Sequence, residues 1–409
     1  MRLLYFVQYF PPEKASGLPI VTDMVEGFAK HGWKVDVYIP TPTRGVTKAV
    51  RKEYSKRRKE VHCNGRLIIH RMHLYREGTS MVQRTIRYSI FSLQCLFRGL
   101  FVPADAIFTG GGPPTQGIVG GLIHKLTKKK FIFNPQDLFP DTLIISGQAT
   151  EKSKAVKLGR KIERFAYRNA DVIITITDDM AENIRSKTND TSKVYVVRNW
   201  IDTDKTVPVP KAENKLFDEL GLSRDKFYVT YAGNIGTMQG LETLVDAADI
   251  LKNESRIEFI VFGNGSEEEN IKTRVSDKLL NNFHIYPLQS LDRISEVYSL
   301  GDVSVVMCKA GTSSAGMPSK TWTIMSTGTP VLGSYDTNSE MECILRDAKC
   351  GFCIEPQNPN ELASAIMDLY KKPDLLAQMG YCARKFAVDK VNKNQGVEKY
   401  ISIIEKYAF

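Results

Sequence analysis

Residues 310–322 combine a run of small residues with one lysine, a pattern suited to binding a diphosphate. Glycine, serine and alanine let backbone N–H groups approach an anion closely, and the start of a following helix adds a partial positive charge. Ser319 is placed to cap that helix and Lys320 to neutralise a phosphate, while Gly328 and Pro330 end the helix before a buried strand. An ordinary loop, helix and strand connection, common in any α/β protein, explains the same residues without a ligand.

Two further glycine turns follow short apolar runs and lead into helical segments. Residues 233–240 follow the run 228–232, and residues 263–266 follow the run 258–262. Backbone groups in such turns can contact a phosphate or a nucleobase, but neither turn has the spacing of a dinucleotide-binding fingerprint or of a P-loop. Because glycine turns commonly end strands, each turn alone is weak evidence for a binding site.

One carboxylate, Asp137, lies in the segment 134–141, directly after the strand-like run 131–133. A carboxylate at the end of a strand could accept a hydrogen bond from a substrate hydroxyl or oppose a developing positive charge. An Asx turn before Pro140 explains the same residue structurally. Asp141 is the weaker candidate for such a role.

No group of side chains has the spacing of a metal site, so no metal ligand is assigned. Cys350 and Cys353 are two residues apart, but they fall on a strand-like run without a nearby histidine and are interpreted as structural. Seven cysteines without framework spacing are typical of a reducing compartment. The six histidines have no convincing partners in the sequence.

Short β-rich runs alternate with helix-length segments along the chain, which predicts parallel sheets with right-handed crossovers and helices on both faces. A polar, proline-containing stretch at 202–215 divides the chain into similar halves. We therefore expect two Rossmann-like domains, 1–201 and 202–389, with a C-terminal helix at 390–409 packing back on the first. Ligands of such sheets bind beyond the carboxyl ends of the strands, so the expected site is a cleft across which the domains face each other.

The formal net charge is +10, and part of it is concentrated at residues 44–60, where eight basic side chains accompany two glutamates. Residues 81–103 form the most apolar helical stretch, but three arginines make it too polar to span a membrane and suited to an interface. Together the two segments predict contact with an anionic membrane surface. A solvated basic face and a buried helix explain them equally well. No nucleic-acid-binding motif accompanies the basic run.

The N-terminal residues 1–7 read as a strand that is followed at once by polar residues and prolines, so they are not interpreted as a signal peptide. We expect a cytoplasmic protein, peripheral at the inner face of the cell membrane.

The order and spacing of these segments resemble the GT-B glycosyltransferases, specifically the large retaining family usually numbered four, over nearly the whole chain. Residues 9–17 resemble the first glycine loop of that family, and residues 199–202 resemble its Asn-Gly-Val-Asp segment. Residues 263–265 are similar to its Gly-Asp-Gly turn, and residues 351–363 to its last strand and following helix.

The resemblance implies a site for a nucleoside-diphosphate sugar, expected to be UDP-linked, with no metal and no cofactor besides this donor. Lys320 and Asp137 are assigned to catalysis, the first at the leaving diphosphate and the second near the donor sugar and the acceptor. Glu13 and Glu340 are candidates for contacts with sugar hydroxyls. The residues assigned to donor binding are Gly17, Gly233, Asn234, Gln239, Gly263, Gly265, Leu288, Ser314, Ala315, Gly316, Met317, Pro318, Ser319 and Thr323.

Four positions depart from the family's pattern. The arginine and lysine that grip the donor pyrophosphate are replaced by Asn234 and Gln239, and two glutamates are replaced by Ala315 and Thr323. Lys320 belongs to a Pro-Ser-Lys variant seen in members that resemble transferases of capsule, O-antigen and exopolysaccharide assembly. A cation on the other side of the diphosphate would keep the electrostatic balance, so Lys320 is predicted to be the main cation for the leaving group.

The implied reaction transfers a hexosyl or N-acetylhexosaminyl group, with retention, to a hydroxyl of a saccharide acceptor. The acceptor is expected to be linked to a polyprenyl diphosphate, in surface polysaccharide biosynthesis. Two other classes stay open. A nucleotide-sugar epimerase of the same fold would need clustered carboxylates and a histidine, and a non-catalytic nucleotide-sugar-binding protein would fit the four departures.

Overall fold

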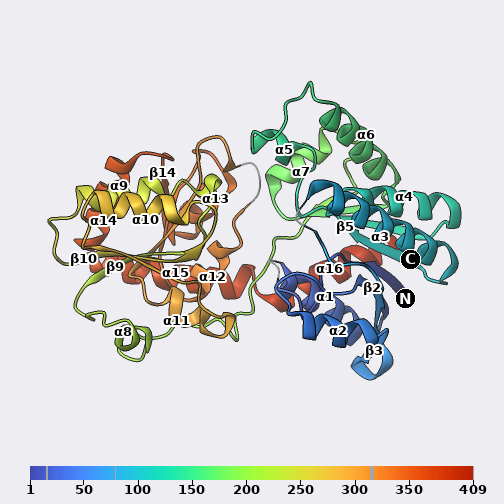
Figure 1. The fold of residues 1–409 in the computed structure, drawn as a ribbon, viewed down its shortest axis with the longest axis horizontal. Helices are drawn as coiled ribbons and strands as arrows, with labels where there is room; N and C mark the ends of the chain where they lie inside the picture. Colours follow the sequence, from blue (N-terminus) through green and yellow to red (C-terminus); the bar gives the residue numbers. More distant parts are fainter. Residues whose placement is uncertain (15–16, 79, 314–316, 409) are drawn as a thin grey trace. The chain divides into compact units, whose positions relative to one another are not determined.

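The computed structural model describes residues 1–14, 17–78, 80–313 and 317–408. Two compact units make up the chain: residues 1–199 with 394–409, and residues 200–393 (Figure 1). Each unit is built on its own twisted sheet, and the prediction of parallel sheets with helices on both faces is confirmed.

The first unit contains an eight-stranded sheet in the order β3-β4-β2-β1-β5-β6-β7-β8. Neighbouring strands are parallel, except that the edge strand β3 runs antiparallel to β4. Most of these strands are apolar along their whole length, because both faces of a parallel sheet are covered. Their bounds are β1 Arg2–Phe6, β2 Lys34–Pro40, β3 Lys59–His62, β4 Leu67–Met72, β5 Ala106–Gly110, β6 Lys130–Asn134, β7 Val172–Thr175 and β8 Val194–Val196.

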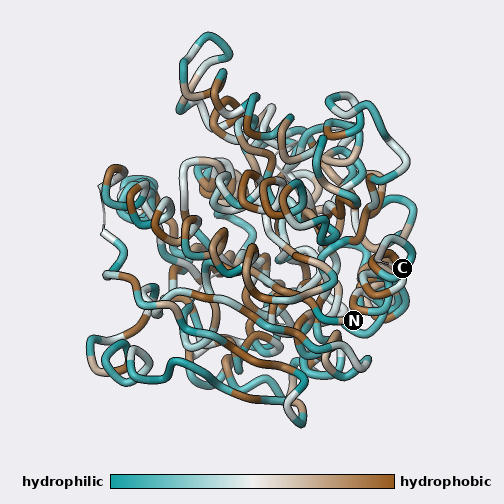
Figure 2. Tube along the Cα trace, turned by 90° about the vertical axis from the view of Figure 1, so that its right-hand side faces the viewer, coloured by the Kyte–Doolittle hydropathy of each residue, from teal (hydrophilic) through white to brown (hydrophobic). Residues whose placement is uncertain are grey.

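Helices cover both faces of this sheet. Successive residues of β1 alternate between two cores. Leu4 and Phe6 pack with Phe91 of α3, whereas the Tyr5 ring contacts the Phe108 ring on the side of α1 and α16. Figure 2 shows hydrophobic and hydrophilic segments alternating along the helices, as expected when one face is buried. The helices are α1 Leu18–Lys30, α2 Lys48–Lys56, η1 Cys63–Gly65, α3 Met81–Phe101, α4 Thr115–Thr127, α5 Asp141–Ile145, α6 Lys154–Asn169, α7 Asp178–Arg185 and α16 Lys393–Ala408.

The C-terminal helix α16 completes the first unit. Asn134 donates a hydrogen bond through Nδ2 to the Tyr400 hydroxyl at 2.9 Å. The hydroxyls of Tyr195 and Tyr407 lie 2.7 Å apart. Residues at the end of the chain therefore hold β6 and β8 in place.

The second unit contains a six-stranded parallel sheet in the order β11-β10-β9-β12-β13-β14. One core lies under α9 and α14, and the other lies under α11, α12, α13 and α15. The strands are β9 Phe227–Asn234, β10 Ile257–Asn264, β11 Phe283–Tyr286, β12 Val303–Met307, β13 Val331–Ser334 and β14 Gly351–Ile354. The helices are α8 Leu216–Glu219, η2 Thr237–Gln239, α9 Glu242–Ile250, α10 Glu268–Asp277, η3 Leu291–Arg293, α11 Ile294–Tyr298, α12 Lys320–Ser326, α13 Glu340–Ala348, α14 Pro359–Tyr370 and α15 Pro373–Lys390.

The stretch 202–215, expected to be a linker, is fastened along the second unit. Arg384 donates to the carbonyls of Thr203 and Thr206 at 2.9 Å each. Farther along, Asn214 donates to the Glu296 carbonyl at 2.7 Å. These bonds leave the stretch little freedom of its own, so it forms part of the second unit.

Candidate donor site

The ammonium of Lys320 lies against the turn that ends β9. Its Nζ stands 3.9 Å from the centre of the Tyr231 ring, on the same strand as Gly233. A Cβ added to Gly233 would come within 2.9 Å of this nitrogen, and Gly233 has φ of 140°. Only glycine therefore allows the lysine to approach the turn so closely. The structure thus brings together Gly233 and Lys320, two of the predicted residues.

Desolvation lowers the pKa of Lys320 to about 7. Within the described ranges, no carboxylate forms an ion pair with Lys320. An ammonium in this position gains strongly from an arriving anion, because the anion restores the interactions that desolvation removed. The contact with the Tyr231 ring compensates for only part of that loss.

Asn234 and Gln239 bond to each other across the turn. Asn234 Nδ2 donates to Gln239 Oε1 at 3.1 Å, and the Tyr231 hydroxyl donates to the Asn234 carbonyl at 2.6 Å. A Cβ on Gly236 would lie only 2.4 Å from Asn234 Nδ2, so the pair fills the inside of the turn. The side chains that replace the family's cations therefore stabilise the turn, and the Gln239 amide group still has N–H groups to offer a ligand.

Gly263 and Gly265 serve the packing of the two turns. A Cβ on Gly263 would lie 2.4 Å from the Gly233 carbonyl oxygen, and a Cβ on Gly265 would lie 2.2 Å from the Ile235 carbonyl oxygen. Ile235 in turn donates its N–H to the Asn264 carbonyl at 2.8 Å. The absence of side chains at these two glycines lets the turn after β10 support the turn that faces Lys320.

The loop of small residues after β12 already binds a carboxylate of the protein, that of Asp336. Asp336 accepts hydrogen bonds from the backbone N–H groups of Gly311 at 2.8 Å and Ser313 at 3.0 Å. Burial alone would raise the pKa of Asp336, but the hydrogen bonds from Ser313 and Gly311 lower it below its usual value. The expectation that this part of the loop is open to a diphosphate is therefore wrong for Gly311 and Ser313. Ser314, Ala315 and Gly316 lie outside the described residues.

Four residues assigned to donor binding lie around the start of α12. Ser319 has helical dihedral angles, φ −59° and ψ −24°, and its side chain makes no capping bond, because a cap needs an extended conformation. The prediction of a Ser319 cap is thus wrong. Met317 packs partly into the core, and Pro318 accepts from the Thr321 N–H at 3.0 Å. Thr323 is 6% exposed, so a ligand can reach only a small part of its side chain.

Leu288 follows β11 and is 54% exposed, so it can be reached by a ligand. In the first unit, Gly17 is the N-terminal boundary residue of α1 and has φ of 80°, a conformation that favours glycine.

Asp137 is exposed at the end of β6. The surrounding protein raises the pKa of its carboxyl group by desolvation. The side chain has no hydrogen-bond partner among the residues described, so the alternative of an Asx turn is not formed. The Asp137 carboxylate, without a partner among the described residues, is therefore available to bind a ligand.

Asp141, the weaker candidate, is occupied. Its carboxylate forms ion pairs with Arg160 at 2.7 Å and with Lys187 at 2.5 Å. Glu163 joins the same two cations at 3.1 and 3.4 Å. This cluster ties α5 and α6 to the segment that follows α7, and it gives Asp141 a structural role.

Glu13, proposed as a contact for sugar hydroxyls, is also occupied. It is 6% exposed and accepts hydrogen bonds from the N–H groups of Thr43 at 2.7 Å and Arg44 at 3.0 Å. These bonds join the loop after β1 to the loop after β2, which makes the ligand-binding role wrong for this residue.

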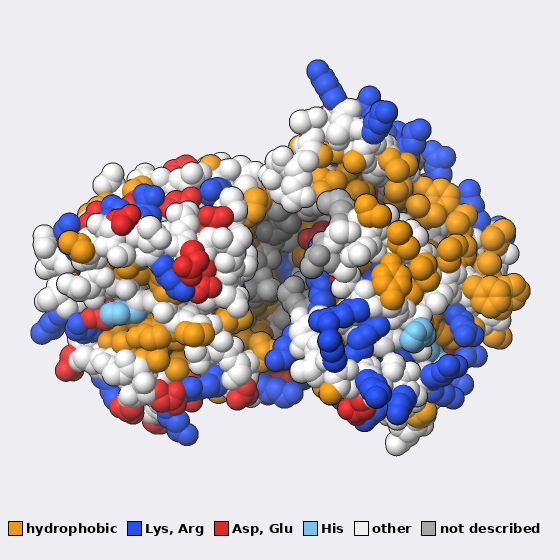
Figure 3. Space-filling view, in the orientation of Figure 1, with side chains coloured by type: hydrophobic (Ala, Val, Ile, Leu, Met, Phe, Trp, Pro, Cys, Tyr) orange, Lys and Arg blue, Asp and Glu red, His pale blue; other side chains and the backbone are white. Residues whose placement is uncertain are grey.

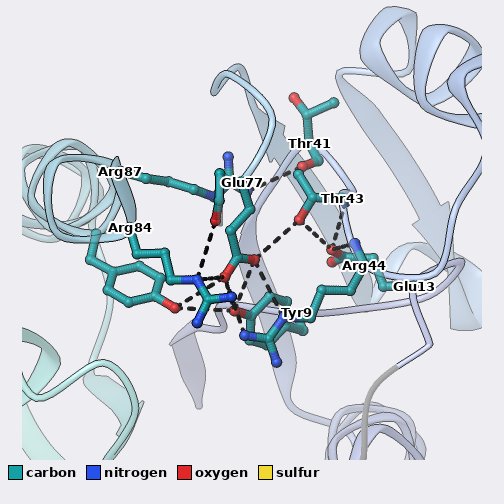
Figure 4. A network of polar contacts seen from close by, with 10 residues as sticks. Tyr9, Glu13, Thr41, Thr43, Arg44, Glu77, Arg84 and Arg87 are labelled. Carbon is teal, nitrogen blue, oxygen red and sulfur yellow. Dashed lines mark hydrogen bonds and ion pairs between the residues drawn. The ribbon is translucent and has the colours of Figure 1, made fainter. Parts of the chain in front are cut away.

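A polar network around Glu77 closes the carboxyl edge of the first sheet (Figure 4). Glu77 accepts from the Tyr9 hydroxyl at 3.1 Å, from Arg44 at 3.2 Å and from the Tyr88 hydroxyl at 3.3 Å, and Arg84 lies 3.7 Å away. Burial alone would raise the pKa of Glu77, but the bonds from Arg44 and Tyr9 lower it. Sequence patterns do not predict this network, because its members lie in three separate loops and on α3.

Neither a metal centre nor a membrane span is found in the part of the chain that the structure describes. No group of three histidine, cysteine, aspartate or glutamate side chains could hold a metal ion there. No helix among those residues is long and apolar enough to cross a membrane.

Two sequence families match the chain, one in each unit. The "Glycosyl transferase 4-like domain" family matches residues 19–200, and the "Glycosyl transferases group 1" family matches residues 212–386. WcaI of Escherichia coli, named for colanic acid biosynthesis, is 27% identical over 415 residues, covering 99% of this chain and 100% of WcaI. The glycosyltransferase WbjE of Pseudomonas aeruginosa is 25% identical over 304 residues, covering 74% of this chain and 73% of WbjE.

Solved structures give the same fold over the whole chain. HepE of Anabaena, in complex with UDP, has a TM-score of 0.75 at 13% identity, with 99% of this chain and 100% of HepE covered. WaaG, a glycosyltransferase involved in lipopolysaccharide biosynthesis, has a TM-score of 0.71 at 13% identity, with 98% and 99% covered. Two α/β sheets of this kind make up the GT-B fold. The chain belongs to the group 1, family-4-like glycosyltransferases.

Proposed function

We propose that this glycosyltransferase transfers a hexosyl or N-acetylhexosaminyl group from a UDP-sugar to a saccharide hydroxyl, with retention at the anomeric carbon. The observation that carries the proposal is the ammonium of Lys320 against the Gly233 turn, where no carboxylate of the described residues pairs with it. During such a transfer, negative charge develops on the leaving diphosphate and positive charge on the sugar ring. A cation beside a glycine turn stabilises the negative charge on the leaving diphosphate. The UDP bound to HepE supports the choice of nucleotide.

In this proposal Lys320 is protonated when the diphosphate binds, and it stays protonated while the bond to the anomeric carbon breaks. Gln239 offers an N–H group to a phosphate oxygen from the other side of the turn. The glycines at 233, 263 and 265 bring backbone close to the ligand without a side chain in the way. Ser314, Ala315, Gly316, Met317, Pro318, Ser319 and Thr323, with Leu288 and Gly17, complete the proposed donor site.

Asp137 is proposed to act on the reacting sugar or the acceptor. Its raised pKa, and a carboxylate without a hydrogen-bond partner among the described residues, suit a group that accepts a hydrogen bond from a hydroxyl and takes up its proton. Asp141 cannot substitute for it, because two cations hold the Asp141 carboxylate.

The acceptor is proposed to be a saccharide linked to a polyprenyl diphosphate, and the pathway to be surface polysaccharide biosynthesis. The names of WcaI and WaaG, which refer to colanic acid and lipopolysaccharide biosynthesis, support this choice. The basic segment 44–60 and the helix at 81–103 support work at an anionic membrane surface.

The test offers the protein a panel of nucleotide sugars with polyprenyl-diphosphate saccharides and follows the anomeric configuration of the product by NMR. The proposal predicts transfer from a UDP-sugar with the donor's configuration kept. An inverted product would contradict retention. Inversion at C2 without transfer would favour the epimerase, and donor binding without turnover would favour the binding protein.

A further inference from the structure

A groove of about 630 Å³ lies on the first unit between α3 and the ends of β2 and β4. The Tyr38 and His70 rings, which line it, stack at 4.5 Å with 9° between their planes. His70 is held from behind by Asp36, whose Oδ1 lies 2.8 Å from His70 Nε2. A groove with so firmly fixed a lining is formed before any ligand arrives.

The charged side chains that line the groove are all arginines, and one of them, Arg71, pairs with Glu60. Arg58 and Arg98 also line the groove, and neither forms an ion pair within the described ranges. Their neighbour Arg57, by contrast, pairs with Glu53. None of the lining residues named for this groove is an aspartate or a glutamate. Two uncompensated guanidinium groups favour a phosphate, which each can contact with two N–H groups.

The wall formed by α3 is apolar and open to the outside. Leu93, Phe97 and Phe101 succeed one another at intervals of four residues, and they are 65%, 60% and 69% exposed. Helical residues four apart lie on one face, so the three side chains form a row. The opposite face of the same helix is buried through Phe91 and Cys95, both at 0% exposure. Figure 3 shows hydrophobic side chains gathered beside lysines, arginines and a histidine on this unit.

One further polar atom in the groove lacks a partner. The Gln94 side chain donates through Nε2 to the His73 carbonyl at 3.4 Å, but its Oε1 is buried without a hydrogen bond in the described part of the chain. A hydroxyl-bearing ligand could donate to this oxygen, which would remove the cost of leaving it unsatisfied.

We propose that this groove binds the headgroup of an anionic membrane phospholipid. The phosphate lies between Arg58 and Arg98, and the acyl chains run along Leu93, Phe97 and Phe101 into the bilayer. A free phosphate would leave the apolar row unused, and a neutral lipid would leave the two guanidinium groups unused. The site rests on the proposed work at an anionic membrane surface and names its lipid ligand, whereas it does not depend on the proposed sugar transfer.

The first test uses a soluble short-chain lipid, dihexanoyl phosphatidylglycerol below its micelle concentration, titrated calorimetrically into the full chain. One lipid is expected to bind per protein, and the double variant Arg58→Gln/Arg98→Gln is expected to bind roughly tenfold more weakly or worse. The matched control is Lys157→Gln/Lys161→Gln on α6, a helix that packs against α4, which in turn packs against α3. This control is expected to bind as the unaltered protein does.

Two outcomes of this titration would overturn the proposal. The first is unchanged affinity in the arginine variant, or an equal loss in the lysine control. The second is equal affinity for sn-glycerol 3-phosphate, because the acyl chains would then contribute nothing.

A second test uses flotation with vesicles containing phosphatidylglycerol. Phe97→Asp is expected to reduce binding at least tenfold, whereas Leu158→Asp, which alters a residue on α6 that is 60% exposed, is expected to bind normally. Equal binding by both variants would overturn the role of the apolar row. UDP binding to the second unit, measured on every variant, separates a failure of this site from a failure of the proposed donor site.

Discussion

The ammonium of Lys320 lies 3.9 Å from the centre of the Tyr231 ring and directly against Gly233. Residues some ninety positions apart in the sequence thus meet at the carboxyl edge of one sheet, as parallel topology requires. No carboxylate of the described chain neutralises this cation. The donor site proposed for this glycosyltransferase depends on that relationship.

The lowered pKa of Lys320 predicts that UDP affinity depends on pH. In the free protein the ammonium predominates below pH of about 7, where desolvation places its pKa. A bound diphosphate stabilises the ammonium and raises that pKa, so binding takes up a proton above pH 7. The affinity is therefore expected to fall between pH 7 and 9, by up to about tenfold per pH unit. Calorimetry in two buffers of different ionisation enthalpy measures both the affinity and the proton uptake.

The control for this pH dependence is Lys320→Arg, because a guanidinium stays charged over the whole range. Its affinity for UDP is expected to change little between pH 7 and 9. A profile as steep as that of the unaltered protein would place the titrating group elsewhere.

The turn after β9 depends on glycine at its contact with the turn after β10. Gly265→Ala would put a Cβ 2.2 Å from the Ile235 carbonyl oxygen, whereas Gly110→Ala, on β5, meets nothing closer than 3.8 Å. We expect Gly265→Ala to lower the free energy of unfolding by about 1–3 kcal/mol and to weaken UDP binding. Gly110→Ala should change neither by a comparable amount. Denaturant unfolding and calorimetry test the pair, and equal stability of the two variants would contradict the packing role.

Substitution of the two aspartates near β6 is expected to have different effects, one on the rate of transfer and the other on stability. Asp137→Asn should lower the rate of transfer about 100-fold at unchanged thermal stability, because its carboxylate has no partner in the described fold. Asp141→Asn should lower the free energy of unfolding by about 3 kcal/mol, because Arg160 and Lys187 lose a partner. Thermal melts and initial rates on both variants separate the roles, and a fully active Asp137→Asn would exclude it from the reaction.

The lowered pKa of Asp141 also predicts how the stability of the protein changes in acid. Burial opposes its ionisation, but the bonds from Arg160 and Lys187 lower its pKa below the usual value. A carboxyl whose pKa is lower in the folded state stabilises the fold above its unfolded pKa of about 4 and loses that contribution as the pH falls further. The unaltered protein should therefore lose more stability below pH 4 than Asp141→Asn does, as acid unfolding of both would show.

Much of the fold was predictable from the sequence because buried parallel strands are apolar throughout, and β9, β10 and β12 are clear examples. The edge strand β3 was missed, since it is short and polar and begins at the end of the basic run. In the candidate site, Lys320 was selected for its residue type and its small neighbours; the structure places it beside Gly233, and its role in donor binding stays a prediction. The hydrogen bond from the Gly311 N–H group to Asp336 was not predictable, because the two residues are 25 positions apart. Glu77 was missed for the same reason, as its partner Tyr9 is 68 residues away.

Asn234 and Gln239 are expected to matter less for transfer than Lys320, because they bond to each other and carry no charge. Lys320→Ala should reduce transfer about 100-fold or more, and Asn234→Ala or Gln239→Ala about tenfold or less. Lys309→Ala is the control, since Lys309 pairs with Glu242 at 3.2 Å on the same unit. Initial rates with the donor found in the nucleotide-sugar panel give the order, and a larger loss at Asn234 or Gln239 would contradict it.

The most direct test of the donor site compares the affinities of UDP and uridine for the unaltered protein and for Lys320→Met. A cation that contacts the diphosphate acts on UDP alone. The variant is expected to bind UDP roughly 10- to 100-fold more weakly and to bind uridine as before. Unchanged UDP affinity, or an equal loss for both ligands, would contradict the placement of the diphosphate at Lys320.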